Sequence, residues 1–156
     1  MGVEIERKFL VHHVPPDLEI ESEDEIAQGY LSVGDDQIRL RRRGDRLLIT
    51  AKRGRGIERA EVEVPISRES FDELWALTEG RRLKKTRRTT PVEAGTIEID
   101  TYHGPLEGLM TAEIEFSDAE SARAFEPPAW FGRELTNDEH YSNERLATEG
   151  LPAKEG

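Results

Sequence analysis

The sequence contains no cysteine, and this absence removes several classes of protein at once. A disulfide scaffold, a catalytic thiol and a zinc site with cysteine ligands are all excluded. No glycine-rich loop ends in Gly-Lys-Ser/Thr, so the chain is not a P-loop protein. The histidines lack the spacing of metal ligands and are expected in loops or at the surface; they are His12, His13, His103 and His140.

Long apolar runs are missing as well. No stretch approaches the length of a membrane span, and no basic-then-apolar leader precedes the first predicted strand. The sequence therefore predicts a cytoplasmic protein with no membrane partner. Its 156 residues are expected to form one domain over residues 1–150, long enough for a real core, followed by a frayed tail at 151–156.

The two signs of charge are unevenly distributed along the chain, whose net charge is −11. Residues 37–90 hold 16 Lys and Arg against 8 Asp and Glu, whereas residues 91–156 hold 4 against 15. A basic middle and an acidic end either occlude each other or flank a site that needs both signs. The basic runs at 39–43 and 84–88 lack interleaved aromatic residues and the whole chain is acidic, so no nucleic-acid partner is expected.

Alternation of apolar and polar residues dominates the chain. This period of two predicts strands with one apolar and one charged face, and the short turns between them predict an antiparallel meander. The predicted strands cover residues 3–11, 25–33, 37–43, 46–53, 58–65, 83–90, 95–102 and 110–116. Helical spacing occurs at 68–79, 118–126 and 136–147.

A single amphipathic strand usually turns its charges toward water, but two features favour the opposite arrangement here. Like charges repeat along individual strands, which costs energy on an open surface. The helices at 68–79 and 118–126 also need an apolar surface to cover. If they cover the apolar faces from outside, the charged faces point inward, and the closed form of such a sheet is a barrel with a polar lumen.

The charged residues of the predicted lumen are of both signs. Such a lumen suits a ligand that combines a divalent metal with negative oxygens. Hard oxygen ligands indicate Mg²⁺ or Mn²⁺, and Lys and Arg in the same cavity indicate phosphate. The lumen residues are Glu4, Glu6, Lys8, Arg39, Arg41, Lys52, Glu61, Glu63, Lys85, Arg87, Glu98, Asp100, Glu113 and Glu115. The sequence thus predicts a polyphosphate ligand.

The same residues resemble the CYTH, or triphosphate tunnel metalloenzyme, family. The resemblance begins at its Glu-x-Glu-x-Lys hallmark, formed here by Glu4, Glu6 and Lys8, and continues through the paired lumen residues in order to Glu115. It covers about residues 3–116 by motif. It implies an α+β fold, an eight-stranded antiparallel β-barrel (tunnel) with helices packed outside, which hydrolyses or cyclises a triphosphate with a divalent metal.

The resemblance also implies roles for individual residues. It assigns phosphate binding to Lys8, Arg39, Arg41, Lys52, Lys85 and Arg87. It assigns metal binding to Glu4, Glu6, Glu113 and Glu115, with Glu98 and Asp100 nearby as ligands or water-orienting groups. Glu61 and Glu63 would instead pair with lumen bases. Tyr30 and Lys85 resemble a catalytic pair proposed in some bacterial members to activate the nucleophile, although Tyr30 could equally be a packing residue.

The substrate expected from these features is inorganic tripolyphosphate, cleaved to pyrophosphate and phosphate. The short chain and the few uncharged lumen residues, Gln28, Tyr30 and Thr50, offer little to recognise a base or thiamine. Thiamine triphosphatase and class IV adenylyl cyclase remain the alternative enzymes, and a non-catalytic polyphosphate-binding module is the alternative of another class. A homodimer is also possible.

Overall fold

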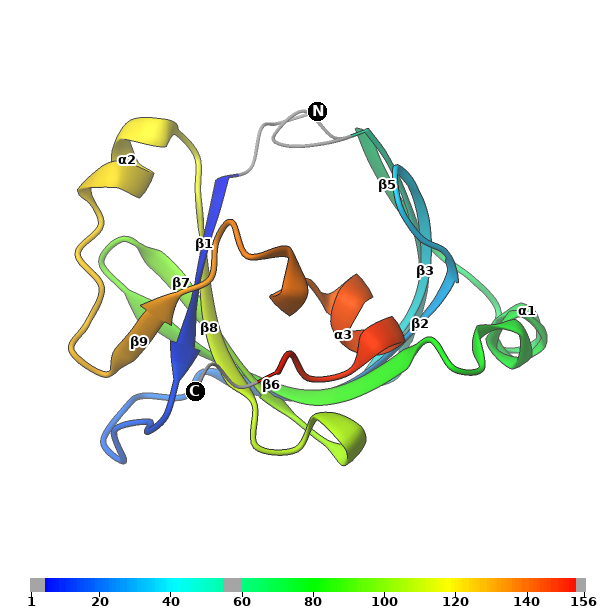
Figure 1. The fold of residues 1–156 in the computed structure, drawn as a ribbon, viewed down its shortest axis with the longest axis horizontal. Coiled ribbons are helices and arrows are strands. Elements are labelled where there is room, and N and C mark those ends of the chain that lie inside the picture. Colours follow the sequence, from blue (N-terminus) through cyan, green and yellow to red (C-terminus); the bar gives the residue numbers. More distant parts are fainter. Residues whose placement is uncertain (1–4, 55–59, 154–156) are drawn as a thin grey trace.

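Nine strands form one antiparallel sheet in the residues that the computed structural model describes, 5–54 and 60–153 (Figure 1). The strands are β1 (Ile5–Val11), β2 (Ser22–Ser32), β3 (Asp36–Arg43), β4 (Arg46–Arg53), β5 (Ala60–Pro65), β6 (Arg82–Val92), β7 (Gly95–Tyr102), β8 (Met110–Phe116) and β9 (Phe131–Glu134). The helices are α1 (Arg68–Trp75), α2 (Ala119–Ala124) and α3 (Asn143–Glu149), with 3-10 turns η1 (Ala76–Thr78), η2 (Gly104–Leu106) and η3 (Glu139–Tyr141). All eight strands expected from the alternation are present, and β9 is an addition.

The sheet curves so strongly that one face becomes the inside of a trough (Figure 1). Its strand order is β5-β4-β3-β2-β6-β7-β8-β1-β9. The antiparallel tunnel architecture is confirmed, but the expected ring is open, since within the described residues β5 and β9 each pair on one side only. Strand β9 pairs with β1 only at Phe9 and Val11, at the end of that strand.

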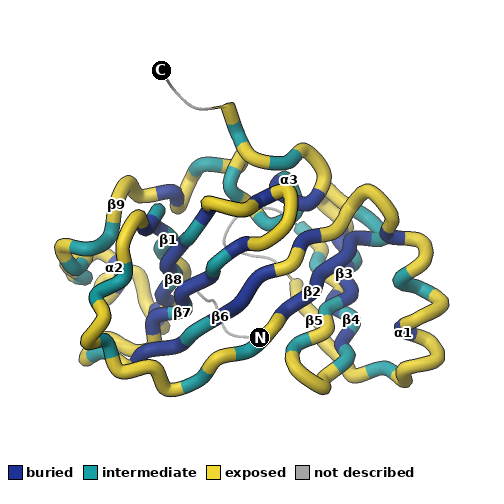
Figure 2. The backbone as a smooth tube through the Cα atoms, turned by 90° about the horizontal axis from the view of Figure 1, so that it is seen from below, coloured by how far each residue is buried: buried dark blue, intermediate teal, exposed yellow. Residues whose placement is uncertain are grey.

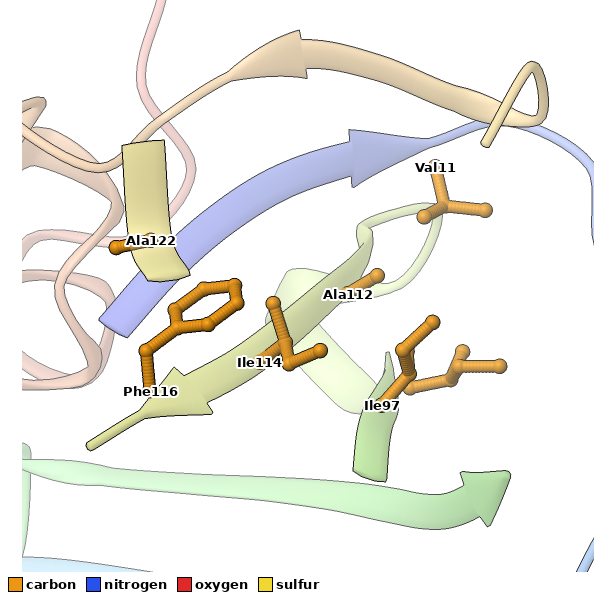
Figure 3. Packing of buried hydrophobic residues seen from close by; sticks show 7 residues of the cluster. Val11, Ile97, Ala112, Ile114, Phe116 and Ala122 are labelled. Carbon is orange, nitrogen blue, oxygen red and sulfur yellow. The ribbon is translucent and has the colours of Figure 1, made fainter. Parts of the chain in front are cut away.

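The outer face of the sheet carries an apolar core, as the alternation predicted. Figure 2 shows buried stretches along β6, β7 and β8, beneath exposed turns. The core cluster, drawn in Figure 3, consists of Val11, Ile97, Ile99, Ala112, Ile114, Phe116 and Ala122. Each large aliphatic side chain buried in this way contributes about 1.5–3 kcal/mol to folding. Helix α2, which supplies Ala122, contacts β1 and β8 and covers the cluster from outside.

Helix α1 covers the outer face at the other end of the sheet, over β3 and β4. Ser67 caps its first turn. The ring of the buried Phe71 stacks on Trp75, with centroids 5.4 Å apart. Gly29 of β2 permits the close approach of this unit, because a Cβ at that position would lie 2.6 Å from Thr78 Oγ1 and 2.9 Å from the Trp75 ring. The glycine is therefore a packing requirement.

Arg7 interrupts the apolar face of β1, and its contacts explain why. Its Nη1 donates to the backbone oxygens of Ala122 and Phe125 at 2.8 and 3.0 Å. Its Nη2 pairs with Glu134 Oε1 of β9 at 2.8 Å. The guanidinium thus binds carbonyl groups at the end of α2, where helical carbonyls have no partner within the helix, and links that helix to β9.

Helix α3 lies inside the curve of the sheet, whereas the sequence pattern placed all helices outside (Figure 1). It contacts β2 and β6. Leu146 and Ala147 of α3 join a second buried cluster at one end of the inner face, which includes Tyr30, Leu83 and Tyr102. The physical reason is that the inner face is apolar at this end, so the small apolar side of α3 is buried there. No helix in the described residues is long and apolar enough to cross a membrane.

Candidate active site

Cross-strand register aligns the predicted site residues in rows across the inner face of the trough. One row runs through Glu63, Thr50, Arg39 and Tyr30, a second through Glu61, Lys52 and Gln37, and a third through Glu98, Glu113 and Lys8. Arg41 is paired with Gln28, Lys85 with Tyr102, Arg87 with Asp100, and Glu6 with Glu115. Glu4, a predicted metal ligand, lies outside the described residues. Most bases thus lie on β3, β4 and β6, and most acids on β7, β8 and β1. The exceptions are Lys8 on β1 and Glu61 and Glu63 on β5.

Asp100 holds two bases together in the basic half of the site. Its carboxylate accepts from Lys85 Nζ at 2.8 Å and from Arg87 Nε and Nη2 at 2.8 and 2.9 Å. Burial would raise the pKa of Asp100, but the two cations outweigh burial and hold this pKa well below its usual range. Burial lowers the pKa of Lys85 to about 7, and the charge of Asp100 offsets burial only in part. Asp100 therefore stays ionised and fixes both side chains.

Two further arginines carry positive charge that the neighbouring acids do not fully balance. Arg41 Nε donates to the neutral Gln28 at 2.9 Å. Its pKa is lowered to about 10, first by burial and then by the charges of Arg39 and Arg87. Arg39 Nη2 lies 3.6 Å from Glu63 Oε2, and Arg39 Nε is buried with no hydrogen-bond partner in the part of the chain that the structure describes. Because buried donors are normally satisfied, this pair of arginines is suited to an anion.

The acids gather at the other side of the trough. Glu113, which is half-buried, is paired across the strands with Glu98 of β7 and Lys8 of β1. The hydrogen bond that Glu6 shares with Glu113 raises the pKa of Glu6, and the charges of Glu113 and Glu115 raise this pKa further. Crowded carboxylates favour a bound cation, because the cation removes the repulsion between them.

The acidic residues fit a hard divalent cation by the chemistry of their donor atoms, since all are carboxylate oxygens. Within 5–54 and 60–153, however, no group of three acidic, histidine or cysteine side chains is arranged so that it could hold a metal ion. A small divalent cation that keeps several waters and shares phosphate oxygens needs only one or two protein carboxylates. Glu6, Glu113 and Glu115 are the candidate ligands among the described residues.

The segment around α3 reaches the inner face, where it contacts Lys8, which the family resemblance assigned to phosphate, and Tyr102, which was not predicted. Lys8 Nζ donates to the backbone oxygen of Tyr141 at 2.7 Å. Tyr102 Oη donates to Asn143 Oδ1, also at 2.7 Å. Neither Tyr141 nor Asn143 was expected in the site, because the predicted helix at 136–147 was placed without reference to the inner face. The sequence feature that could have indicated a role in the site is the polar first turn of α3, which begins at Asn143.

Lys85 contacts an aromatic ring, that of Tyr102. Its ammonium lies 5.5 Å from the centroid of the Tyr102 ring. Tyr30 is buried, which raises its pKa, and its hydroxyl accepts from Gln28 Nε2 at 3.1 Å. The catalytic pairing of Tyr30 with Lys85 stays a prediction. Tyr102 has the same strand parity as Asp100, so the alternation alone was sufficient to place it on the inner face.

The protein is an antiparallel β-sheet folded into an open trough, whose inner face carries both basic and acidic side chains. The chain matches the CYTH domain over residues 2–149 and belongs to that family. It is 44% identical over 147 residues to an inorganic triphosphatase from Nitrosomonas europaea, a match that covers 92% of this chain and 96% of the relative. It is 35% identical over 156 residues to an inorganic triphosphatase from Acetivibrio thermocellus, covering 94% of each chain.

The fold is also similar to that of a solved protein. The crystal structure of the inorganic triphosphatase NE1496 superposes with a TM-score of 0.76 at 39% identity. The superposition covers 97% of this chain and 99% of the other. The similarity therefore extends over the whole of the trough and the helices around it.

Proposed function

We propose that this protein is a divalent-metal-dependent hydrolase that cleaves inorganic tripolyphosphate to pyrophosphate and phosphate. The observation that carries the proposal is Arg39 Nε, which is buried without a hydrogen-bond partner among the described residues. It lies beside Arg41, whose pKa is lowered first by burial and then by like charges. These cations need an anion, and the glutamates across the trough need a cation. A linear polyphosphate with a bound divalent ion supplies both. The names of the two relatives support the same substrate.

The proposed roles follow the two halves of the inner face. Phosphate binding falls to Lys8, Arg39, Arg41, Lys52, Lys85 and Arg87. Metal binding falls to Glu4, Glu6, Glu113 and Glu115, with Glu98 and Asp100 nearby, and the metal is Mg²⁺ or Mn²⁺. Glu61 and Glu63 pair with bases at the β5 rim, and Lys85 with Tyr30 assists the nucleophile. Lys8 donates one of its three N–H groups to Tyr141, which leaves two for a phosphate, and Asp100 already binds two bases.

The reaction places few chemical demands on the protein. The oxygen of water bonds to the terminal phosphorus, the bond from that phosphorus to the bridging oxygen breaks, and the bridging oxygen leaves on pyrophosphate. The attacking water loses a proton to its surroundings. Catalysis of such a transfer is mainly positioning and neutralisation of charge, which arginines and lysines on a rigid sheet supply. A divalent cation, when bound, would add Lewis-acid neutralisation of the phosphate oxygens.

A panel of phosphate compounds tests the choice of substrate. With Mg²⁺ or Mn²⁺, tripolyphosphate should show a kcat/KM well above that of ATP or thiamine triphosphate, because the inner face offers charges but few groups that recognise a base. Pyrophosphate should be a poor substrate or an inhibitor, since it is too short to contact both halves of the trough. Phosphate release measured with each of the four compounds identifies the preferred substrate.

Three other results of this panel would replace the proposal. Faster formation of cyclic AMP from ATP than of phosphate from tripolyphosphate would identify a cyclase. Preference for thiamine triphosphate would identify that hydrolase. Tight binding of tripolyphosphate without turnover under any metal would identify a binding module.

Two adjacent arginines on β3 provide a matched test of which face binds phosphate. Arg41→Ala removes an inner-face cation and should raise the KM for tripolyphosphate about ten- to a hundredfold, the loss expected for one charge-assisted contact. Arg42→Ala removes an exposed cation on the opposite face of the strand and should leave KM unchanged. Initial-rate kinetics on both purified variants measure the difference. Equal effects would show that the trough is not the binding face.

A further inference from the structure

The ammonium group of Lys85 is held from several sides. Its side chain has 0% exposure, and its Nζ contacts Asp100 Oδ2 at 2.8 Å and the ring of Tyr102 at 5.5 Å from the centroid. A third contact comes from α3, where Asn143 Oδ1 lies 3.5 Å from Nζ. Because a lysine ends in a compact charge on a flexible four-carbon stem, its position depends on such contacts.

The oxygen of Asn143 is itself fixed by a stronger hydrogen bond. Tyr102 Oη donates to Asn143 Oδ1 at 2.7 Å, the usual distance for a well-formed hydrogen bond between two oxygens and shorter than the 3.5 Å from Lys85 Nζ. Two donors, the Tyr102 hydroxyl and the Lys85 ammonium, therefore converge on one oxygen. Of the two oxygen acceptors that contact Lys85, Asp100 is charged and is shared with Arg87, whereas Asn143 is neutral.

The helix that carries Asn143 is anchored independently of Lys85. Glu144 accepts from the backbone nitrogen of Gly34 at 2.8 Å and from Gln37 Nε2 at 2.6 Å. Leu146, one turn further along, is buried against the inner face. These contacts place α3 over β2 and β6, within the curve of the sheet (Figure 1). Asn143 thus reaches Lys85 from a fixed support.

We propose that Asn143 is a positioning residue, which holds the Lys85 ammonium in its working position through the hydrogen-bonded chain Tyr102–Asn143–Lys85. The role of Lys85 in the reaction rests on the proposed function. The holding of its ammonium rests on the contacts alone. In this arrangement the C-terminal helix is a component of the site.

The test compares Asn143→Ala, Tyr102→Phe and their double variant in steady-state kinetics with tripolyphosphate. Each single change should lower kcat about ten- to a hundredfold, the range for a misplaced catalytic group, and leave KM within about twofold. Because both residues act through one hydrogen bond, the double variant should be no slower than the slower single variant. Losses that multiply, or a normal kcat in Asn143→Ala, would overturn the proposal.

The matched control is Arg145→Ala, two residues further along α3. Its guanidinium pairs with Glu149 and Glu139 at the surface, so kcat should be that of the wild type. Unchanged amide exchange of the α3 residues in Asn143→Ala would show that the helix is still docked. An effect of Arg145→Ala as large as that of Asn143→Ala would mean that any disturbance of α3 suffices, and would overturn the specific role of Asn143.

A second readout does not depend on turnover. In protein with isotope-labelled lysine, the side-chain resonance of Lys85, assigned with Lys85→Arg, should shift or broaden in Asn143→Ala and stay in place in Arg145→Ala. If wild-type protein fails to cleave tripolyphosphate, the proposed function fails, while this spectrum still decides whether Asn143 holds Lys85. An unchanged Lys85 resonance in Asn143→Ala would refute the inference even in an active enzyme.

Discussion

Glu113→Gln should lower the kcat for tripolyphosphate by about a hundred- to a thousandfold, and excess chelator should abolish turnover of the wild type. Glu113 lies at the middle of the acidic half, sharing a hydrogen bond with Glu6 and paired across the strands with Glu98. Its loss removes a carboxylate that would hold the divalent cation. Phosphate release in a titration with Mg²⁺ and Mn²⁺ measures the effect.

The same variant separates metal binding from folding. Gln at position 113 relieves the crowding of carboxylates around Glu6, so the metal-free protein should melt at the wild-type temperature or above it. The rise in melting temperature that the metal gives the wild type, by binding the folded state, should be lost. Glu107→Gln, the same change at an exposed turn, is the matched control. Full activity in excess chelator would eliminate the metal-dependent mechanism.

Arg87→Ala should cost about 3–5 kcal/mol of unfolding free energy, as expected when one partner of a buried ion pair is removed. The change leaves Asp100 with one cation in place of two and removes the partner of Glu98. It should also reduce kcat/KM strongly, because Arg87 is a proposed phosphate ligand. Urea unfolding followed by circular dichroism measures the first effect and initial rates measure the second.

Two variants accompany this experiment. Arg88→Ala alters the next residue on the outer face, which is half-buried, and should change stability by no more than about 0.5 kcal/mol. Arg87→Lys keeps the charge but loses the two-pronged hydrogen bond to Asp100, so its stability should lie between the other two. If Arg87→Ala were as stable as Arg88→Ala, the network around Asp100 would not contribute to folding.

Much of this fold was predictable because the alternation has a physical cause. Side chains of a strand point to opposite faces, and a sheet covered by helices on one side buries that side. Ile97 and Ile99 on the outer face and Glu98 and Asp100 on the inner face follow directly from this rule. Charges on the same parity of successive strands therefore meet across the inner face.

The alternation of strand side chains could not predict the position of α3. A seven-residue helix with two buried side chains has too weak a pattern to indicate which side of a sheet it covers. Its position depends on hydrogen bonds that Glu144 accepts from Gly34 and Asn143 accepts from Tyr102, and both donors are more than forty residues away in the chain. Tyr102 was missed for a different reason. Its position two residues after Asp100 places it on the inner face, but only the charged residues of that strand were considered as site residues.

The internal position of α3 has a consequence for the order of folding. The hydrogen bond from Gly34 to Glu144 spans 110 residues, and closing so long a loop in an unfolded chain costs about 4 kcal/mol. Once β9 has paired, fewer than ten residues separate it from Asn143, and closure costs about 2 kcal/mol. We therefore expect the helix to dock after the sheet has formed. On this order the helix and the sheet are two cooperative units, and we expect the sheet to be the more persistent.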